Sequence, residues 1–368
     1  MNALRPRCRR RRLPVRIAFT LTELLVVIAI IGIMASSVLF AMWGAMEMAR
    51  EARTRTQIAK LHELLMTRWE GYQTRALRLD LTPAMRRNAR VAAITRLNAL
   101  RDLMRMEMPD RIEDVVDDPV DCSPTGTGVH LPIPSLLHEY RRRATSTWTA
   151  EFQDAECLYM IVASIRTPEG NGLDFLHEGE IGDLDGDGMP EILDAWGRPI
   201  AFIRWPAGFV AHPGPDFVRG TSDDLPSYSD LQLFTVDGDG YVLPEDRDPF
   251  DPLQLDRRAG VPIPAADGAG DGLYFFNFAL YPLICSAGPD QDVHLVRYDF
   301  DPLDAARTPI AFRYYRDISN PYADPDNTDA ILRNDPYSIL PNSGRRLGEP
   351  FLESFGYADN IHNHAMGE

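Results

Sequence analysis

The sequence predicts an α+β fold, in which a long N-terminal transmembrane helix forms a spine and a C-terminal globular head contains a small antiparallel sheet. Three observations support this prediction. Residues 24–46 contain no charged side chain, apolar residues recur with helical spacing over residues 58–79, and several short runs after residue 198 alternate as strands do. The expected parts are a basic leader (1–18), a transmembrane and extended helix (19–82), a second helix (83–108), a linker (109–150) and an acidic head (151–368).

Charge is strongly segregated along the chain. Residues 1–18 hold seven arginines and no acidic residue, whereas residues 112–368 hold 17 basic against 45 acidic side chains, a net charge of −28. Such an acidic head repels nucleic acid and attracts cations, so we expect no nucleic-acid partner. The four cysteines show neither a CxxC pair nor zinc-ligand spacing, which argues against a disulfide scaffold and a zinc site.

The first structural element is the uncharged run of 23 residues at 24–46. As a helix it spans roughly 34 Å, which exceeds a hydrocarbon core of about 30 Å. The sequence ASS at residues 35–37 permits a second interpretation, a cleavable secretory signal, but the apolar run continues past it. The arginine-rich residues 1–18 favour a cytoplasmic N-terminus, although the far flank of the run is also basic.

One carboxylate, Glu23, stands at the start of this apolar run. A buried, unpaired carboxylate is among the least favourable groups that a protein can contain, so a partner is expected to neutralise it. The alternative is that Glu23 marks the end of the helix at the membrane surface, where a carboxylate suits the positive end of the helix dipole.

Apolar side chains continue with helical spacing beyond the membrane segment. Intervals of three or four residues lay them along one helix face; they are Ile58, Leu61, Leu65, Trp69, Tyr72, Ala76 and Leu79. The helix is expected to run from Phe19 to Asp80, because Thr82 precedes Pro83 and is disfavoured in a helical conformation. A second series of apolar residues predicts another helix, which is expected to end at the dipeptide Met108-Pro109.

The stretch AFTLTELLVVIAIIGIMASS at residues 18–37 resembles the N-terminal signature of type IV pilins and type II secretion pseudopilins. In that family, prepilin peptidase removes a basic leader before a phenylalanine, whose new amine is then methylated. The resemblance implies cleavage between Ala18 and Phe19, and it makes Glu23 the fifth residue of the mature chain. Ala18 replaces the family's usual glycine, and Thr22 stands where an aliphatic residue is more common.

The same resemblance implies how the protein assembles. In filaments of the family, the carboxylate at the fifth position pairs with the N-terminal amine of a neighbouring subunit, so Glu23 is expected to guide packing. The implied partners are prepilin peptidase, other pilin or pseudopilin subunits and an assembly platform in the inner membrane. The implied location is the inner (cytoplasmic) membrane, crossed once, with the head in the periplasm or outside, and later a filament.

The head shows one helix and several strand-like runs. Residues 151–166 have the pattern of a buried helix, with apolar residues on its inner side. Alternating apolar runs predict strands at 199–205, 231–236, 273–280 and 292–298. His362 and His364 form an HxH pair in a polar tail, where a surface position is expected.

The strongest chemical motif is DLDGDGMPEILD at residues 183–194. Numbered as a twelve-residue calcium loop, it places Gly188 at the sharp turn. The candidate ligands are Asp183, Asp185, Asp187, the backbone carbonyl of Met189, Glu191 and Asp194. Carboxylates so close in sequence repel one another unless a hard dication lies among them, which makes calcium the expected cofactor. The alternative is a solvated acidic turn without a metal.

Two short segments of the head are similar to segments of the major pseudopilin of type II secretion. Residues 194–199 (DAWGRP) are similar to its D-x-W-G-x-P segment, and residues 286–290 (SAGPD) are similar to its S-x-G-x-D turn. The second resemblance implies that Asp290 is a further calcium-ligand candidate.

No catalytic motif is present in the sequence: GxSxG, a Walker loop, HExxH and a dinucleotide fingerprint are all missing. We therefore expect a pilin-like structural subunit and not an enzyme. The alternative is a single-pass, membrane-anchored calcium-binding or ligand-binding module that never polymerises.

Overall fold

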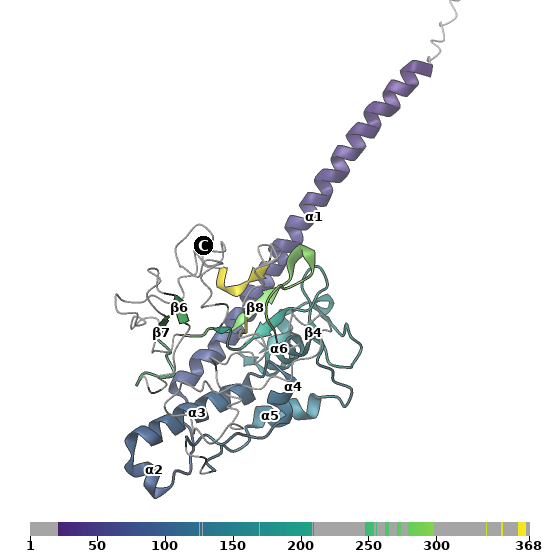
Figure 1. Cartoon of the computed structure of the whole chain (residues 1–368). Helices are drawn as coiled ribbons and strands as arrows, with labels where there is room; N and C mark the ends of the chain where they lie inside the picture. The colour runs from purple at the N-terminus through teal and green to yellow at the C-terminus, as the bar shows by residue number, and fades with distance from the viewer. Residues whose placement is uncertain are drawn as a thin grey trace, which may run out of the picture. The chain divides into compact units, whose positions relative to one another are not determined.

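The computed structural model describes residues 21–124, 126, 128–168, 170–207, 209, 247–253, 255, 262–264, 271–273, 279–297, 336, 347–348 and 360–365. The chain divides into two compact units, Met1–Ala49 and Arg50–Glu368. A long apolar N-terminal helix and a C-terminal part with small antiparallel sheets confirm the α+β class (Figure 1). Ala18, Phe19 and the expected strand at 231–236 lie outside the described residues.

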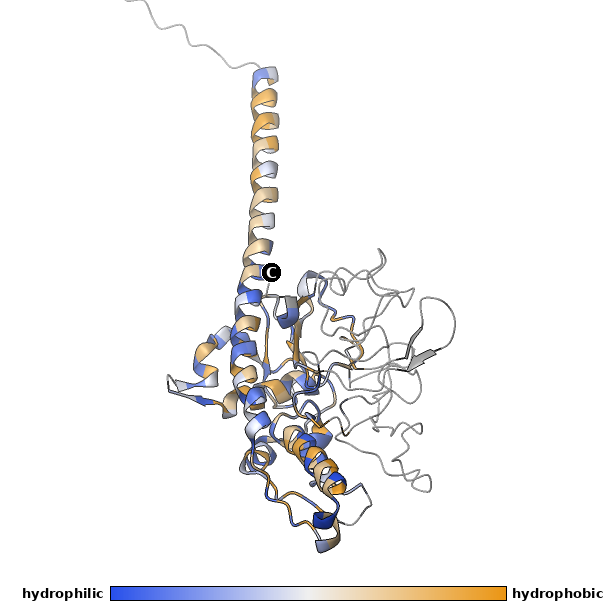
Figure 2. Cartoon of the chain, turned by 90° about the vertical axis from the view of Figure 1, so that its left-hand side faces the viewer, coloured by the Kyte–Doolittle hydropathy of each residue, from blue (hydrophilic) through white to orange (hydrophobic). Residues whose placement is uncertain are grey.

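Helix α1 runs from Leu21 to Gly71. Its apolar part is exposed, and Figure 2 shows hydrophobic residues along it. Within the described residues, this is the one helix that is long and apolar enough to cross a membrane. The apolar run at 24–46 therefore forms the continuous helix that the sequence predicts.

The second half of α1 belongs to the C-terminal unit and contributes to its core. The predicted apolar stripe is confirmed over five residues, which are almost fully buried: Ile58, Leu61, Leu65, Trp69 and Tyr72. The expected extension to Asp80 is wrong, because α1 ends at Gly71 and a 3₁₀ turn follows at Tyr72–Thr74. Glycine weakens a helix, and after the turn Arg75 adopts an extended backbone conformation, with φ −65° and ψ 122°.

The predicted second helix is present in two pieces, α2 (Pro83–Arg87) and α3 (Ala89–Glu107). Asn88 separates them, and its side chain caps α3 by accepting a hydrogen bond from the Val91 amide. The expected irregular linker at 109–150 instead contains α4 (Ile112–Val116) and α5 (Ser135–Arg143).

Buried ion pairs connect this segment to other parts of the head. Three arginines and three aspartates lie together in the interior: Arg105, Arg111, Arg204, Asp102, Asp110 and Asp114. Arg204 contacts Asp114 at 2.8 Å and Asp110 at 3.3 Å. The two aspartates flank the start of α4, and Arg204 follows a strand, so the pairs join segments distant in sequence.

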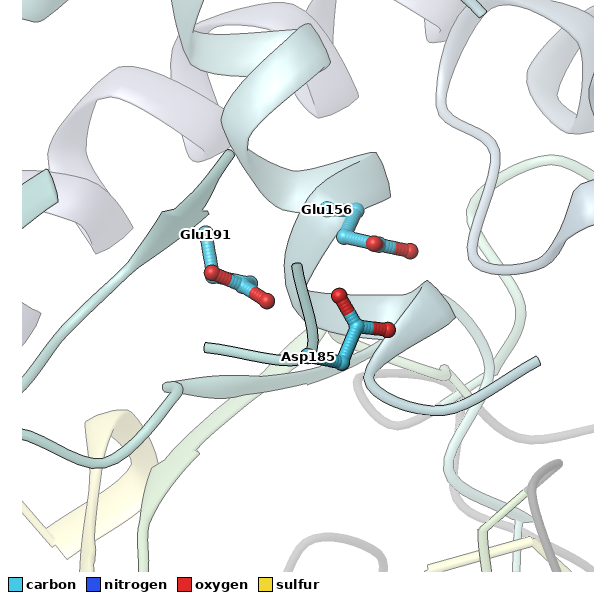
Figure 3. A group of neighbouring side chains, drawn as sticks. All are labelled: Glu156, Asp185 and Glu191. Atoms are coloured by element: carbon cyan, nitrogen blue, oxygen red, sulfur yellow. The ribbon is translucent and has the colours of Figure 1, made fainter. Parts of the chain in front are cut away.

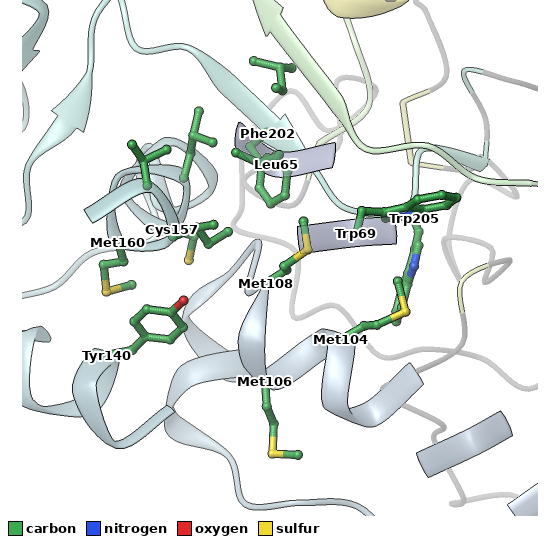
Figure 4. Close-up of a cluster of buried hydrophobic side chains, with 14 of the residues drawn as sticks. Leu65, Trp69, Met104, Met106, Met108, Tyr140, Cys157, Met160, Phe202 and Trp205 are labelled. Carbon is green, nitrogen blue, oxygen red and sulfur yellow. The ribbon is translucent and has the colours of Figure 1, made fainter. Parts of the chain in front are cut away.

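Helix α6 (Gln153–Ser164) confirms the buried helix predicted at 151–166. It contributes to a core with α1, α3 and strand β5 (Ala201–Ile203), shown in Figure 4. The three described cysteines, Cys122, Cys157 and Cys285, are buried.

Among the residues that the structure describes, the largest sheet is antiparallel and has the order β5–β8–β9. Its strands are Ala201–Ile203, Leu283–Ser286 and Ile361–His362. Ala201 pairs with Cys285, and Cys285 with His362. Three two-stranded sheets accompany it: β1 (Arg166–Thr167) with β2 (Gly170–Asn171), β3 (Ile181–Gly182) with β4 (Glu191–Ile192), and β6 (Pro262–Pro264) with β7 (Asp271–Leu273). Short 3₁₀ turns occupy Gly172–Phe175, Glu178–Glu180, Gly288–Asp290 and Asn363–Ala365.

The strand predictions are only partly right. Strand β5 confirms the run at 199–205, whereas the run at 273–280 contributes only Leu273 to β7, and its residues 274–278 lie outside the described part. Residues 292–297 form no strand, because Gln291 and His294 have left-handed backbones that interrupt an extended path. His362 is buried in β9 and not at the surface, since it pairs with the central strand β8.

Candidate cation site in the acidic loop

The acidic loop is closed at its base by the β3–β4 hairpin. Ile181 pairs with Ile192, and Gly182 with Glu191, so the residues between them must form a compact loop. Gly186 and Gly188 both have positive φ angles, of 75° and 89°. Only glycine adopts this conformation readily, which explains the two glycines between the aspartates.

Three loop aspartates converge. Asp183, Asp185 and Asp187 each offer a carboxylate oxygen, and these oxygens lie within 4.8 Å of one another. Asp183 accepts hydrogen bonds from the amides of Gly186 and Gly188 at 2.8 and 3.1 Å. Asp187 Oδ1 accepts from the Met189 amide at 2.8 Å. The loop amides therefore fix the positions of these carboxylates.

A threonine-rich segment before α6 also holds the loop. Thr147 donates from its hydroxyl to the Asp187 carbonyl at 2.6 Å. The Thr149 amide donates to Asp187 Oδ2 at 2.6 Å, and its hydroxyl donates to Asp185 Oδ2 at 2.8 Å. The loop is thus anchored to the segment that leads into α6.

A second carboxylate group lies deeper and includes a residue that the sequence reasoning missed. Glu156 of α6, Asp185 of the loop and Glu191 of β4 offer oxygens within 4.8 Å of one another (Figure 3). Glu156 and Glu191 are each 0% exposed. The Trp148 indole donates to Glu156 Oε2, while both oxygens of Glu191 accept from the Leu184 amide. No feature of the loop pattern identifies Glu156, which lies 27 residues before Asp183.

The electrostatics of this deeper group favour a cation. Burial, together with the neighbouring carboxylates, raises the pKa of Glu156 to about 9 and that of Glu191 to about 7. Among the described residues, none of the five carboxylates in the two groups forms an ion pair with an arginine, lysine or histidine. Oxygen-only donors without a cationic partner fit a hard divalent cation such as calcium better than a transition metal.

Asp194, expected at position twelve of the loop, lies in a different network. Its Oδ1 accepts from the amides of Trp196 and Arg198 at 2.8 and 2.9 Å, and its Oδ2 accepts from the Ser286 hydroxyl at 2.6 Å. The structure therefore brings together the two segments at 194–199 and 286–290, although Asp194 joins neither carboxylate group.

Of the remaining candidates, Asp290 is separate from the two groups, whereas the Met189 amide contacts Asp187 of the outer group. Asp290 lies in a 3₁₀ turn, and its Oδ2 contacts His294 Nε2 at 2.8 Å. Met189 is buried. Glu23 lies exposed in the first turn of α1.

Comparisons with known proteins give no assignment. No protein-family model, curated protein or solved structure matches the chain. The functional conclusion therefore depends on the residues and geometry described above.

Proposed function

We propose that this protein is a pilin-like structural subunit, which prepilin peptidase processes and which assembles into a type II secretion pseudopilus or a type IV pilus-like filament. The observation that carries the proposal is the start of α1. Glu23 lies in the first turn, and the uncharged run at 24–46 is exposed along the helix. An exposed apolar helix of this length needs lipid or other apolar helices around it.

The proposed mechanism is mechanical assembly from the inner membrane. The apolar helix stores the subunit in the bilayer, with the arginine-rich leader in the cytoplasm and the acidic head on the other side. Cleavage creates an amine at Phe19, four residues before Glu23 and about one helical turn away. In a filament, the amine of a neighbouring subunit pairs with Glu23 and offsets its charge among the apolar helices.

Mass spectrometry of the N-terminus of the native protein tests this proposal. A filament subunit is expected to begin at a methylated Phe19, and cells that lack prepilin peptidase are expected to retain residues 1–18. An intact leader in cells that contain the peptidase would contradict the proposal. It would favour the alternative of a permanently anchored binding module.

We also propose calcium as a cofactor of the acidic loop. The support is the convergence of Asp183, Asp185 and Asp187 around a turn that only glycine readily permits. The ion supplies positive charge that relieves their repulsion and stiffens the hairpin.

Thermal unfolding of the full-length protein in detergent tests the calcium proposal. Calcium is expected to raise the midpoint relative to a chelator, by an amount corresponding to about 2.7 kcal/mol at a hundredfold excess over Kd. Asp187→Ala is expected to abolish the shift, whereas Glu178→Ala, which changes an exposed carboxylate outside the loop, should preserve it. Equal midpoints with calcium and with chelator would contradict a metal at this loop.

A further inference from the structure

We propose that a divalent cation binds in the interior of the head between α6 and the acidic loop, with Glu156, Asp185 and Glu191 as its carboxylate ligands. Each ligand comes from a different element: α6, the loop itself and strand β4. Figure 3 shows the three side chains pointing toward one another. This inference refines the metal proposal and does not depend on the filament proposal.

The first supporting observation is an unsatisfied oxygen. Oε1 of Glu156 is buried and has no hydrogen-bond partner among the described residues, while Oε2 accepts from Trp148. Leaving such an atom without a partner is strongly unfavourable. A bound cation would contact this oxygen directly and would also offset the charge of the adjacent Asp185 and Glu191 carboxylates.

The second observation is the spacing of the donors. The three oxygens lie within 4.8 Å of one another. Two ligands on opposite sides of a calcium ion, each at about 2.4 Å, are about 4.8 Å apart. All three oxygens therefore fit a single calcium coordination sphere, in which backbone carbonyls or waters complete the shell.

The third observation concerns Asp185, which the outer and the deeper group share. Four oxygens of Asp183 and Asp187 accept hydrogen bonds from backbone amides of the loop and of Thr149. These bonds shape the loop, and Asp185 accepts from the Thr149 hydroxyl and the Asp187 amide, so the outer carboxylates help to hold Asp185 beside Glu156 and Glu191. A cation in the deeper group therefore links the start of α6 to the β3–β4 hairpin.

Calorimetric titration of the full-length, chelator-treated protein with calcium chloride in detergent tests the inference. Glu156→Gln keeps the side-chain shape but removes the charge, and we expect it to weaken calcium binding at least tenfold. The matched control is Glu151→Gln, an exposed glutamate five residues earlier, which should bind as the unmodified protein does. Unchanged affinity in Glu156→Gln would overturn the inference.

Two further measurements separate a ligand from a structural residue. In chelator, Glu156→Gln should melt at or above the temperature of the unmodified protein, because a neutral amide replaces a buried acidic group that lies beside two other carboxylates. Hydrogen exchange of the unmodified protein avoids substitutions altogether. Calcium should slow exchange both in the loop at 183–190 and in the first turns of α6, and slowing confined to the loop would overturn the inference. N-terminal processing is measured independently, so the filament proposal can fail while this one holds.

Discussion

Arg204 is the central residue of the buried ion pairs in the head. It is fully buried, and its guanidinium donates to the Met108 carbonyl at 2.7 Å and to Asp114 at 2.8 Å. Burial alone would raise the pKa of Asp114, but Arg204, Arg111 and Arg105 hold it well below its usual value. Asp114 therefore remains ionised and offsets several buried positive charges.

Removal of this charge should destabilise the head strongly. Asp114→Asn leaves the surrounding guanidinium groups without their main counter-ion, and we expect a loss of about 3 kcal/mol in the free energy of unfolding. Urea unfolding of the full-length protein in detergent measures this loss in the free energy of unfolding. The control is Asp118→Asn, which removes an exposed partner of Arg141 and should cost less than about 1 kcal/mol. Similar losses in the two variants would show that the buried pairs are not stabilising in this way.

Individual site residues differ in how far sequence spacing can predict them. Asp183, Asp185 and Asp187 converge as expected, because their spacing and the intervening glycines act locally. Glu156 could not be predicted, since only the tertiary packing of α6 brings it to the loop. Asp194 stands at position twelve of the calcium-loop pattern. Its oxygens nevertheless accept hydrogen bonds from the following turn and from Ser286, a residue distant in sequence.

At the scale of elements, the two halves of α1 differ in how apolar residues are distributed around the helix. The first half is apolar on every side, which composition alone predicts. The second half has an apolar stripe, and its spacing correctly predicts which residues enter the core as far as Tyr72. The stripe continues in sequence to Leu79, but the helix ends at Gly71 and Arg75 is extended, so apolar spacing alone does not locate the end of the helix.

Trp69 is one of the α1 residues that belong to the core of the head. It is 2% exposed and packs against Phe250 and Tyr281, with ring centroids at 4.8 and 4.9 Å. We expect Trp69→Ala to lower the free energy of unfolding by about 3–5 kcal/mol, because it leaves a large cavity. Trp43→Ala changes a tryptophan of the same helix that is 69% exposed, and it should alter this value by less than about 0.5 kcal/mol. Urea unfolding distinguishes them, and a Trp69→Ala loss as small as that of Trp43→Ala would refute the anchoring role.

At the scale of the whole molecule, local patterns predict the outline but not the packing of the head. The apolar run is predicted by its composition and length, and strand β5 by its alternation, and both element types are correct. Residues 109–150 are rich in proline, glycine and charge, which favours an irregular segment, yet their Asp110 and Asp114 pair with the distant Arg204. A charged residue whose partner is about 90 positions away gives no local signal of burial.

The proposed filament role makes its sharpest prediction at Glu23. Glu23→Ala keeps the uncharged run at 24–46, so membrane insertion and leader removal should be unchanged. Incorporation should fall at least tenfold, equivalent to about 1.4 kcal/mol, because the amine of each neighbouring subunit would be buried without its counter-ion. Quantitative immunoblotting of membrane and sheared-filament fractions measures membrane insertion and filament incorporation in the same cells. Glu63→Ala removes an exposed carboxylate from the same helix and should assemble normally. Equal incorporation of the two variants would mean that the charge at Glu23 does not direct assembly, since both retain the same apolar surface.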